Sequence, residues 1–198
     1  MTLLLASQSA ARRAMLHAAG IDHDAMAPGV DEEAAKAALR ADGLSPRDLA
    51  DALAELKALR ISKRVPGAMV LGGDQTLALD DGTMLDKPAD RRAAAVQLRT
   101  LRGRAHRLIS AAVIAENGAA VWRVADTATL EVREFSEAWL ESYLDAESEA
   151  ILGCVGSYRL EARGAQLFSR VRGDHFTILG LPLLALLDYL RTRGVIAS

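Results

Sequence analysis

The chain has 198 residues, of which 51% are hydrophobic and 25% charged, and its formal net charge is −2. This ordinary globular composition argues against bulk disorder, and the length predicts a single domain over residues 1–198. The slight negative charge argues against a protein that holds a nucleic acid polymer by bulk electrostatics.

The cysteine content and the apolar runs indicate the cellular location of the protein. Cys154 is the only cysteine, which excludes an intrachain disulfide and a cysteine-based zinc site, and we interpret it as a small buried apolar residue. The apolar opening at residues 1–6 lacks the preceding basic segment of a signal peptide. The apolar stretch at 178–187 is too short to span a bilayer. We therefore expect a cytoplasmic protein with no membrane partner.

In the first half of the chain, short apolar runs alternate with helical segments. Ser45 and Pro46 predict a helix start, because serine caps helices and proline suits the first helical position. The predicted strands are residues 3–6, 22–28 and 68–72, the last ending at Gly73-Asp74-Gln75; the predicted helices are a segment ending before Gly20, an alanine-rich segment after 33, and 46–64.

The second half contains a hairpin and three further helices. Asn117 and Gly118 lie between two apolar runs, 105–115 and 119–132, and Asn-Gly in that position is a strong hairpin signal. The predicted helices are a segment from Pro88 and Asp90 to Gly103, 136–143 and 182–193, and short strands are expected within 150–180. Intermixed helices and strands predict an α/β or α+β class with a mixed sheet.

A candidate phosphate site follows the first strand. Ser7, Ser9 and Arg12 lie where this strand leads into a helix, and the backbone N–H groups of a helix N-terminus favour an anion. Two hydroxyls and a guanidinium there would suit a phosphate. Plain capping of the helix by Ser9 is an equally good explanation.

Asp74 and Lys57 are the next candidates. Asp74 follows two glycines at a predicted strand end, where glycines let a ligand approach the backbone and the carboxylate could bind a cation or act as a general base. The competing interpretation is an acid that caps a turn. Lys57 lies along the apolar edge of its helix, so its ammonium either reaches water or meets an anion.

Other charged residues allow simpler interpretations. Lys87 precedes Pro88 at a helix start, where it would meet either a phosphate or only solvent. The arginines of the 91–107 stretch fit a solvated helix face better than a nucleic-acid patch. The sequence lacks a Gly-x-x-x-x-Gly-Lys-Ser/Thr loop and a Gly-x-Ser-x-Gly elbow, which excludes a Walker-type NTPase and this type of serine hydrolase.

Taken in order, these motifs resemble the Maf family of nucleoside triphosphate pyrophosphatases over roughly residues 3–193. The motifs that carry the resemblance are Leu5-Ala6-Ser7-Gln8-Ser9 with Arg12, Val30-Asp31-Glu32, Leu56-Lys57-Ala58, Leu71-Gly72-Gly73-Asp74-Gln75, Lys87-Pro88, Leu101-Arg102-Gly103-Arg104-Ala105-His106, Gly156-Ser157-Tyr158 and Gly173 through Gly180-Leu181-Pro182-Leu183.

The resemblance implies an elongated, two-lobed, mixed-sheet α/β fold of the Maf/inosine-triphosphatase-like type with a central cleft. It also implies hydrolysis of a nucleoside triphosphate to the monophosphate and pyrophosphate, dependent on a divalent metal cation such as magnesium or manganese, and it suggests a homodimer. Asp74 maps to the proton acceptor; Ser7, Ser9, Arg12, Glu32, Lys57 and Lys87 map to phosphate and substrate binding. We expect Glu32 and Asp74 to hold the metal, since magnesium needs few protein oxygens beside substrate phosphates.

By the same resemblance, positions 11, 75 and 161 decide which nucleobase is preferred. The branch of the family that acts on dTTP and UTP has Arg, Thr and Gln at these three positions, and the branch that acts on 7-methyl-GTP has Trp, Gln and Glu. This chain has Ala11, Gln75 and Glu161, so two of the three positions favour 7-methyl-GTP. Ala11 departs from both branches and lacks a stacking contact of about 1–3 kcal/mol. A dTTP/UTP pyrophosphatase and a nucleotide-binding regulator of septum formation and cell division are the alternatives.

Overall fold

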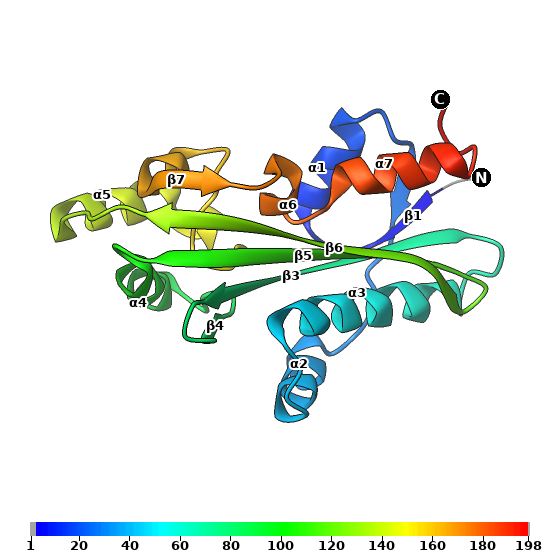
Figure 1. Cartoon of the computed structure of the whole chain (residues 1–198), viewed down its shortest axis with the longest axis horizontal. Coiled ribbons are helices and arrows are strands. Elements are labelled where there is room, and N and C mark those ends of the chain that lie inside the picture. The colour runs from blue at the N-terminus through cyan, green and yellow to red at the C-terminus, as the bar shows by residue number, and fades with distance from the viewer. Residues whose placement is uncertain (1–2, 198) are drawn as a thin grey trace. The chain divides into compact units, whose positions relative to one another are not determined.

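The computed structural model describes residues 3–197 as a mixed α/β fold (Figure 1). Its seven-stranded sheet has the order β2-β1-β3-β5-β6-β7, with β4 paired to β3. The strands are β1 (Leu3–Ala6), β2 (His23–Ala25), β3 (Met69–Leu79), β4 (Met84–Leu85), β5 (Ala105–Glu116), β6 (Ala119–Val132) and β7 (Phe168–Arg172). The helices are α1 (Ala10–Ala18), α2 (Glu32–Ala41), α3 (Pro46–Ser62), α4 (Arg91–Leu101), α5 (Glu137–Glu147), α6 (His175–Ile178) and α7 (Leu183–Thr192), with 3-10 turns η1 (Ser148–Ile151) and η2 (Arg163–Leu167).

The described residues form two compact units. The first unit comprises residues 3–75, 109–126 and 174–197, and the second comprises 76–108 and 127–173. Strands β3, β5 and β6 each have residues in both units. The mixed-sheet α/β class is confirmed, whereas a single domain and a cleft between two lobes stay predictions.

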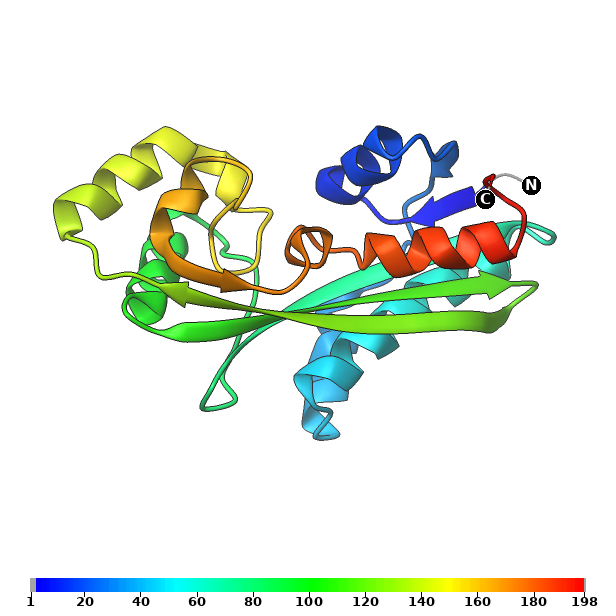
Figure 2. The same ribbon diagram turned by 45° about the horizontal axis from the view of Figure 1, so that its top comes forward.

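The first unit has helices on both faces of its strands. Side chains alternate along β1, so Leu3 and Leu5 join a core with α1 and α7, while Leu4 and Ala6 join a second cluster with Ile61 of α3. Figures 1 and 2 show α7 and α3 on opposite sides of the strands. Because both faces are covered, these strands read as continuous apolar runs.

Local signals placed the helix starts and the hairpin correctly. Ser9 and Ser45 accept hydrogen bonds from the backbone amides three residues later, and Pro46 is the first residue of α3. Asn117 and Gly118 both have positive φ at the turn between β5 and β6, as a tight Asn-Gly hairpin turn requires. None of the helices within residues 3–197 has the length and apolar character needed to cross a membrane.

Three expectations were wrong in detail. Strand β3 does not end at Gly73 but continues to Leu79, because its polar side chains find partners inside the fold. The 150–180 region contains one strand, β7, among the described elements, and otherwise 3-10 turns, bends and α6. Cys154 is half-buried rather than part of the core.

The core of the second unit contains a buried histidine. His106 on β5 is fully buried, and its Nε2 lies 2.6 Å from the hydroxyl of Tyr158. The ring also lies beside Phe168, with the centroids 6.2 Å apart. Its Nδ1 has no hydrogen-bond partner among the described residues. Burial lowers the pKa of His106 to about 4, so the imidazole is neutral at pH 7.

This histidine makes the stability of the protein pH-dependent. Because the pKa of His106 is about 4 when folded and 6.5 in its ordinary state, the unfolded chain binds a proton first as the pH falls. Its contribution is complete above pH 6.5 and is lost between 6.5 and 4. We expect the free energy of unfolding, measured by urea denaturation, to fall by about 2 kcal/mol between pH 7.5 and 5. His106→Gln keeps a hydrogen-bonding group without titrating and should abolish most of this difference; an unchanged pH dependence would contradict the assignment.

Candidate functional site

Ser7 and Arg12 form a buried polar pair beside the end of β1. The Ser7 Oγ accepts from the backbone N–H of Ser9 at 3.2 Å and from Arg12 Nη1 at 3.3 Å. Ser9 itself caps α1 through the amide of Arg12. Helix capping by Ser9 is therefore real, and it orients the same turn that carries the candidate phosphate-binding groups.

Arg12 is held from both sides. Its Nε donates to the carbonyl of Gly180 at 2.7 Å, and its side chain is almost completely buried. Burial lowers the pKa of the Arg12 guanidinium, while the nearby carboxylates of Asp74 and Glu32 oppose that shift. A guanidinium stays charged under any physiological condition, so a fixed positive charge lies next to two carboxylates.

Lys57 joins the two carboxylates. Its Nζ lies 2.7 Å from Asp74 Oδ1 and 2.8 Å from Glu32 Oε2. The Lys57 and Asp74 side chains are 5% and 10% exposed, whereas that of Glu32, the first residue of α2, is 42% exposed. The ammonium thus meets anions instead of reaching water, as a buried charge requires.

Gly72 and Gly73, which precede Asp74, lie against other parts of the protein and not against an open space for a ligand. A Cβ on Gly72 would lie 2.1 Å from the carbonyl oxygen of Ala54 in α3, and a Cβ on Gly73 would lie 3.1 Å from Arg12 Nε. The expectation that they admit a ligand to the backbone is wrong: parts of the protein itself fill both spaces. Gly72 lets α3 approach β3, which brings Lys57 to Asp74.

The position of Asp74 also differs from the expected strand end. Asp74 lies inside β3, two residues beyond Gly72, which pairs with Ala6 at the end of the parallel neighbour β1. The strand end that borders the site is therefore that of β1. Ligands in α/β proteins commonly bind at the carboxyl ends of parallel strands.

The carboxylates fit a divalent cation that is shared with a substrate. No group of three or more histidine, cysteine, aspartate or glutamate side chains able to hold a metal occurs within residues 3–197. Asp74 and Glu32 nevertheless converge on one point, the Lys57 ammonium. Two carboxylates completed by phosphate oxygens and water are a usual set of magnesium ligands, so the donors suit magnesium better than a metal that needs a full protein cage.

Gln75 and Ala11 lie in the same unit. Ala11 is a half-buried residue of α1. The side-chain Nε2 of Gln75 lies 3.0 Å from Ser110 Oγ, 3.1 Å from the Thr177 carbonyl and 3.0 Å from the Ile178 carbonyl. Sequence reasoning missed Ser110 and Thr177, and no local pattern around either residue points to this contact.

Lys87 and Glu161 belong to the second unit. Lys87 is exposed in the loop after β4, and Glu161 is exposed in a turn before η2. Burial raises the pKa of the Cys154 thiol; Glu161 adds to this shift and Lys87 opposes it, so both charges act on the same thiol. Their roles toward a substrate stay predictions.

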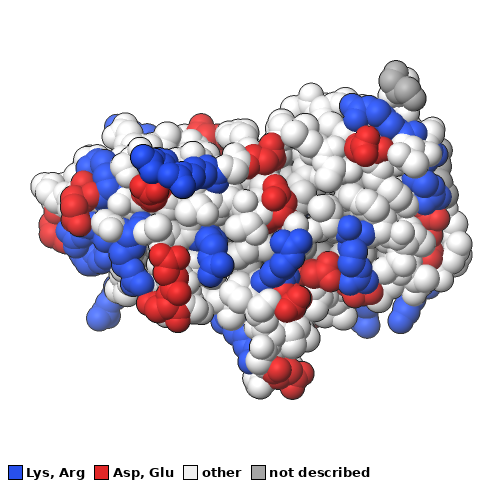
Figure 3. Space-filling model, viewed as in Figure 1, with Lys and Arg blue, Asp and Glu red and all other residues white. Residues whose placement is uncertain are grey.

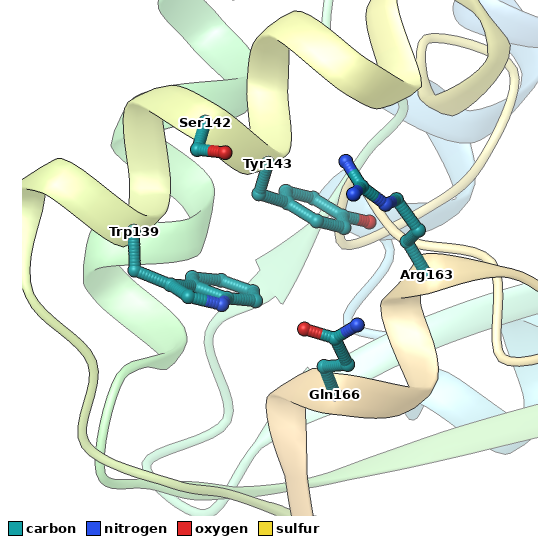
Figure 4. A pocket seen from close by; sticks show the side chains of 5 residues that line it. All are labelled: Trp139, Ser142, Tyr143, Arg163 and Gln166. Atoms are coloured by element: carbon teal, nitrogen blue, oxygen red, sulfur yellow. The ribbon is translucent and has the colours of Figure 1, made fainter.

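The second unit also contains a small pocket without a predicted site residue. Trp139, Ser142, Tyr143, Arg163 and Gln166 line a space of about 50 Å³ (Figure 4). Pockets for small-molecule ligands usually hold roughly 300–1,000 Å³. This pocket is therefore too small for a nucleotide.

The arginines of the 91–107 stretch are largely paired with acids. Arg91 contacts Glu141 and Asp145, and Arg99 and Arg102 both contact Glu137. Figure 3 shows basic and acidic side chains interspersed on one face of the molecule. The pairing supports the interpretation of these arginines as a solvated, ion-paired surface.

Comparison with known proteins gives one consistent result. The model of the Maf-like protein family matches residues 2–193. A relative from Caulobacter vibrioides is 51% identical over 97% of this chain and 96% of its own length, and one from Sphingopyxis alaskensis is 51% identical over 98% of both. A third, from Hyphomonas neptunium, is 50% identical over 100% of this chain and 99% of its own. All three carry the name nucleoside triphosphate pyrophosphatase. The resemblance inferred from the motifs is confirmed, and the chain belongs to the Maf-like protein family.

Proposed function

We propose that this protein hydrolyses a nucleoside triphosphate to the nucleoside monophosphate and pyrophosphate. The observation that carries the proposal is the cluster in which the buried Lys57 bridges the buried Asp74 and the more exposed Glu32 beside Arg12. Family membership and the name shared by the full-length relatives support the same reaction.

Charge explains how the cluster would receive a triphosphate. Arg12 and Lys57 offset Asp74 and Glu32, so the four side chains have no net charge. A triphosphate brings about four negative charges, and positioning together with charge stabilisation supplies most of the catalysis in phosphoryl chemistry. Arg12 and Ser7 would bind phosphate oxygens, and Lys57 would balance charge between substrate and carboxylates. A divalent cation held by Asp74 and Glu32 would supply Lewis-acid stabilisation of the developing charge.

Asp74 is the proposed general base. Lys57 engages its Oδ1, and Oδ2 accepts no hydrogen bond from any residue within 3–197. In the proposed step, Oδ2 takes a proton from a water whose oxygen attacks the α-phosphorus. The bond from that phosphorus to the bridging oxygen breaks, and pyrophosphate leaves with the electron pair.

The nucleobase is a finer part of the proposal. Glu161 can accept hydrogen bonds from the N1–H and exocyclic amine of guanine, and its negative charge suits a cationic methylated purine. We therefore propose 7-methyl-GTP or another modified nucleotide as the substrate. One alternative is the same reaction on dTTP and UTP. The other is a protein that binds nucleotides without hydrolysing them and regulates septum formation. Cytoplasmic location, a homodimer and a single functional domain belong to the same proposal.

The test is pyrophosphate release with magnesium from 7-methyl-GTP, GTP, dTTP, UTP and CTP. We expect release to be highest with 7-methyl-GTP, and we expect Glu161→Gln to reduce that preference by about 1.5–3 kcal/mol, the usual contribution of a hydrogen bond to a charged group. The matched control is Glu149→Gln, an exposed acid of the same unit.

Each outcome assigns a different function. Preference for dTTP and UTP would support the pyrophosphatase reaction and overturn the proposed preference for 7-methyl-GTP. Nucleotide binding without any pyrophosphate release would favour the regulatory alternative. A melting temperature unaffected by magnesium and every triphosphate would exclude a nucleotide ligand, because saturation to about 100 times Kd stabilises a protein by about 2.7 kcal/mol.

A further inference from the structure

Gln75 uses its amide nitrogen entirely within the protein. The two hydrogens of Nε2 face three oxygens, those of Ser110 Oγ and the carbonyls of Thr177 and Ile178. A carbonyl only accepts hydrogen bonds, so the two carbonyls fix which end of the carboxamide faces them. No hydrogen of this group remains for a nucleobase.

The segment that Gln75 contacts is itself firmly held. The Thr177 Oγ1 donates to Asp126 Oδ2 at 2.8 Å, and the Thr177 amide donates to Asp174 Oδ1 at 3.0 Å. The Ser110 hydroxyl donates to the same Thr177 carbonyl at 2.7 Å. Thr177 is completely buried. This segment therefore provides a fixed point for the strand that carries Asp74.

The same segment also holds Arg12. Gly180 follows α6, and its carbonyl oxygen accepts a hydrogen bond from Arg12 Nε. Its φ of +107° lies in the region that only glycine occupies readily. Residues 177–180 thus contact both Gln75, the residue next to Asp74, and the guanidinium of Arg12.

We propose that Gln75 is a positioning residue, which ties β3 next to Asp74 to residues 177–180 and so fixes Asp74 relative to Arg12. The proposal rests on the proposed pyrophosphatase reaction. It differs from a role for Gln75 in reading the base, because a positioning residue affects every nucleotide alike. Misplacement of a reacting group by about 1 Å can cost on the order of a hundredfold in rate.

The variants are Gln75→Met, which removes the carboxamide at similar length, and Gln75→Glu, which keeps the shape but loses both donors. Gln166→Met, at an exposed position of the second unit, is the matched control. We expect kcat to fall by about 10- to 100-fold for every nucleotide of the panel, with KM changed less than about threefold and the ratios between nucleotides kept within about twofold. Assays at least about 20 °C below each melting temperature keep the folded fraction constant, so lost stability alone would leave kcat unchanged.

Hydrogen exchange gives a readout independent of activity. The amides of Ile178, Leu179 and Gly180 donate to carbonyls of residues 174–177, and we expect them to exchange faster in Gln75→Met while α3 is unaffected. An altered ratio between nucleotides, or unchanged kcat with unchanged exchange, would overturn the proposal while the wild type stays active. Absence of pyrophosphate release from the wild type would instead overturn the proposed function, and the positioning role of Gln75 in that reaction with it.

Discussion

Asp74→Asn should abolish pyrophosphate release while leaving the fold intact. Asparagine has nearly the same shape and keeps an oxygen for Lys57, but it cannot take a proton from water. Loss of a general base costs about 10²–10⁴-fold in rate. Because Lys57 keeps Glu32 at 2.8 Å, we expect a loss of only about 1–3 kcal/mol in unfolding free energy. Initial rates across the nucleotide panel and urea denaturation measure the two effects.

The matched control is Asp188→Asn, an exposed aspartate on α7 in the same unit. It makes the same chemical change away from the cluster and should leave both rate and stability unchanged. If Asp74→Asn keeps more than about a tenth of the wild-type rate, Asp74 is not the base, since that lies outside the range for such a group. Loss of circular dichroism in the variant would show that the rate had fallen through unfolding.

The sequence predicted those parts of the fold that short-range chemistry decides. Ser45 and Pro46 specify the start of α3 through contacts with the next three residues. Asn117 and Gly118 specify a tight turn through their own backbone preferences. The motif order identified the family, and the structure brings Ser7, Arg12, Glu32, Lys57 and Asp74 into one cluster. For Lys57, its place along the apolar edge of its helix left two possibilities, water or an anion, and the structure shows two carboxylates at its ammonium.

Long-range packing decides the parts that the sequence did not reveal. The segment Gly73-Asp74-Gln75 predicts a strand end, yet β3 continues because Lys57 and Ser110 satisfy the polar side chains of Asp74 and Gln75. Whether a glycine faces a ligand or a neighbouring helix depends on elements far along the chain. The contact from Arg12 to Gly180 joins opposite ends of the sequence, and no local pattern encodes it.

Gly72→Ala should strongly destabilise the first unit, because Gly72 leaves the least room for a Cβ among the glycines of that unit. The added Cβ would lie 2.1 Å from the Ala54 carbonyl oxygen, 2.8 Å from the Ala58 nitrogen and 2.9 Å from the Ala58 Cβ. These atoms belong to backbone and to alanine, so no side chain can rotate away and α3 must move. Overpacking of this kind costs about 1–3 kcal/mol or more, and we expect the upper end, a fall in melting temperature of roughly 10 °C.

The same change should reduce activity, because moving α3 draws Lys57 away from Asp74. Gly73→Ala separates the two effects: the three atoms nearest to its Cβ would all belong to the Arg12 side chain, at 3.1 Å or more. That side chain can shift, so we expect less than about 1 kcal/mol of destabilisation but a raised KM, since Arg12 is the proposed phosphate ligand. Gly153→Ala, where a Cβ meets nothing within 4 Å, is the neutral control. A Gly72→Ala protein with the melting temperature and activity of Gly153→Ala would show that close contact between α3 and β3 is not what places Lys57 against Asp74.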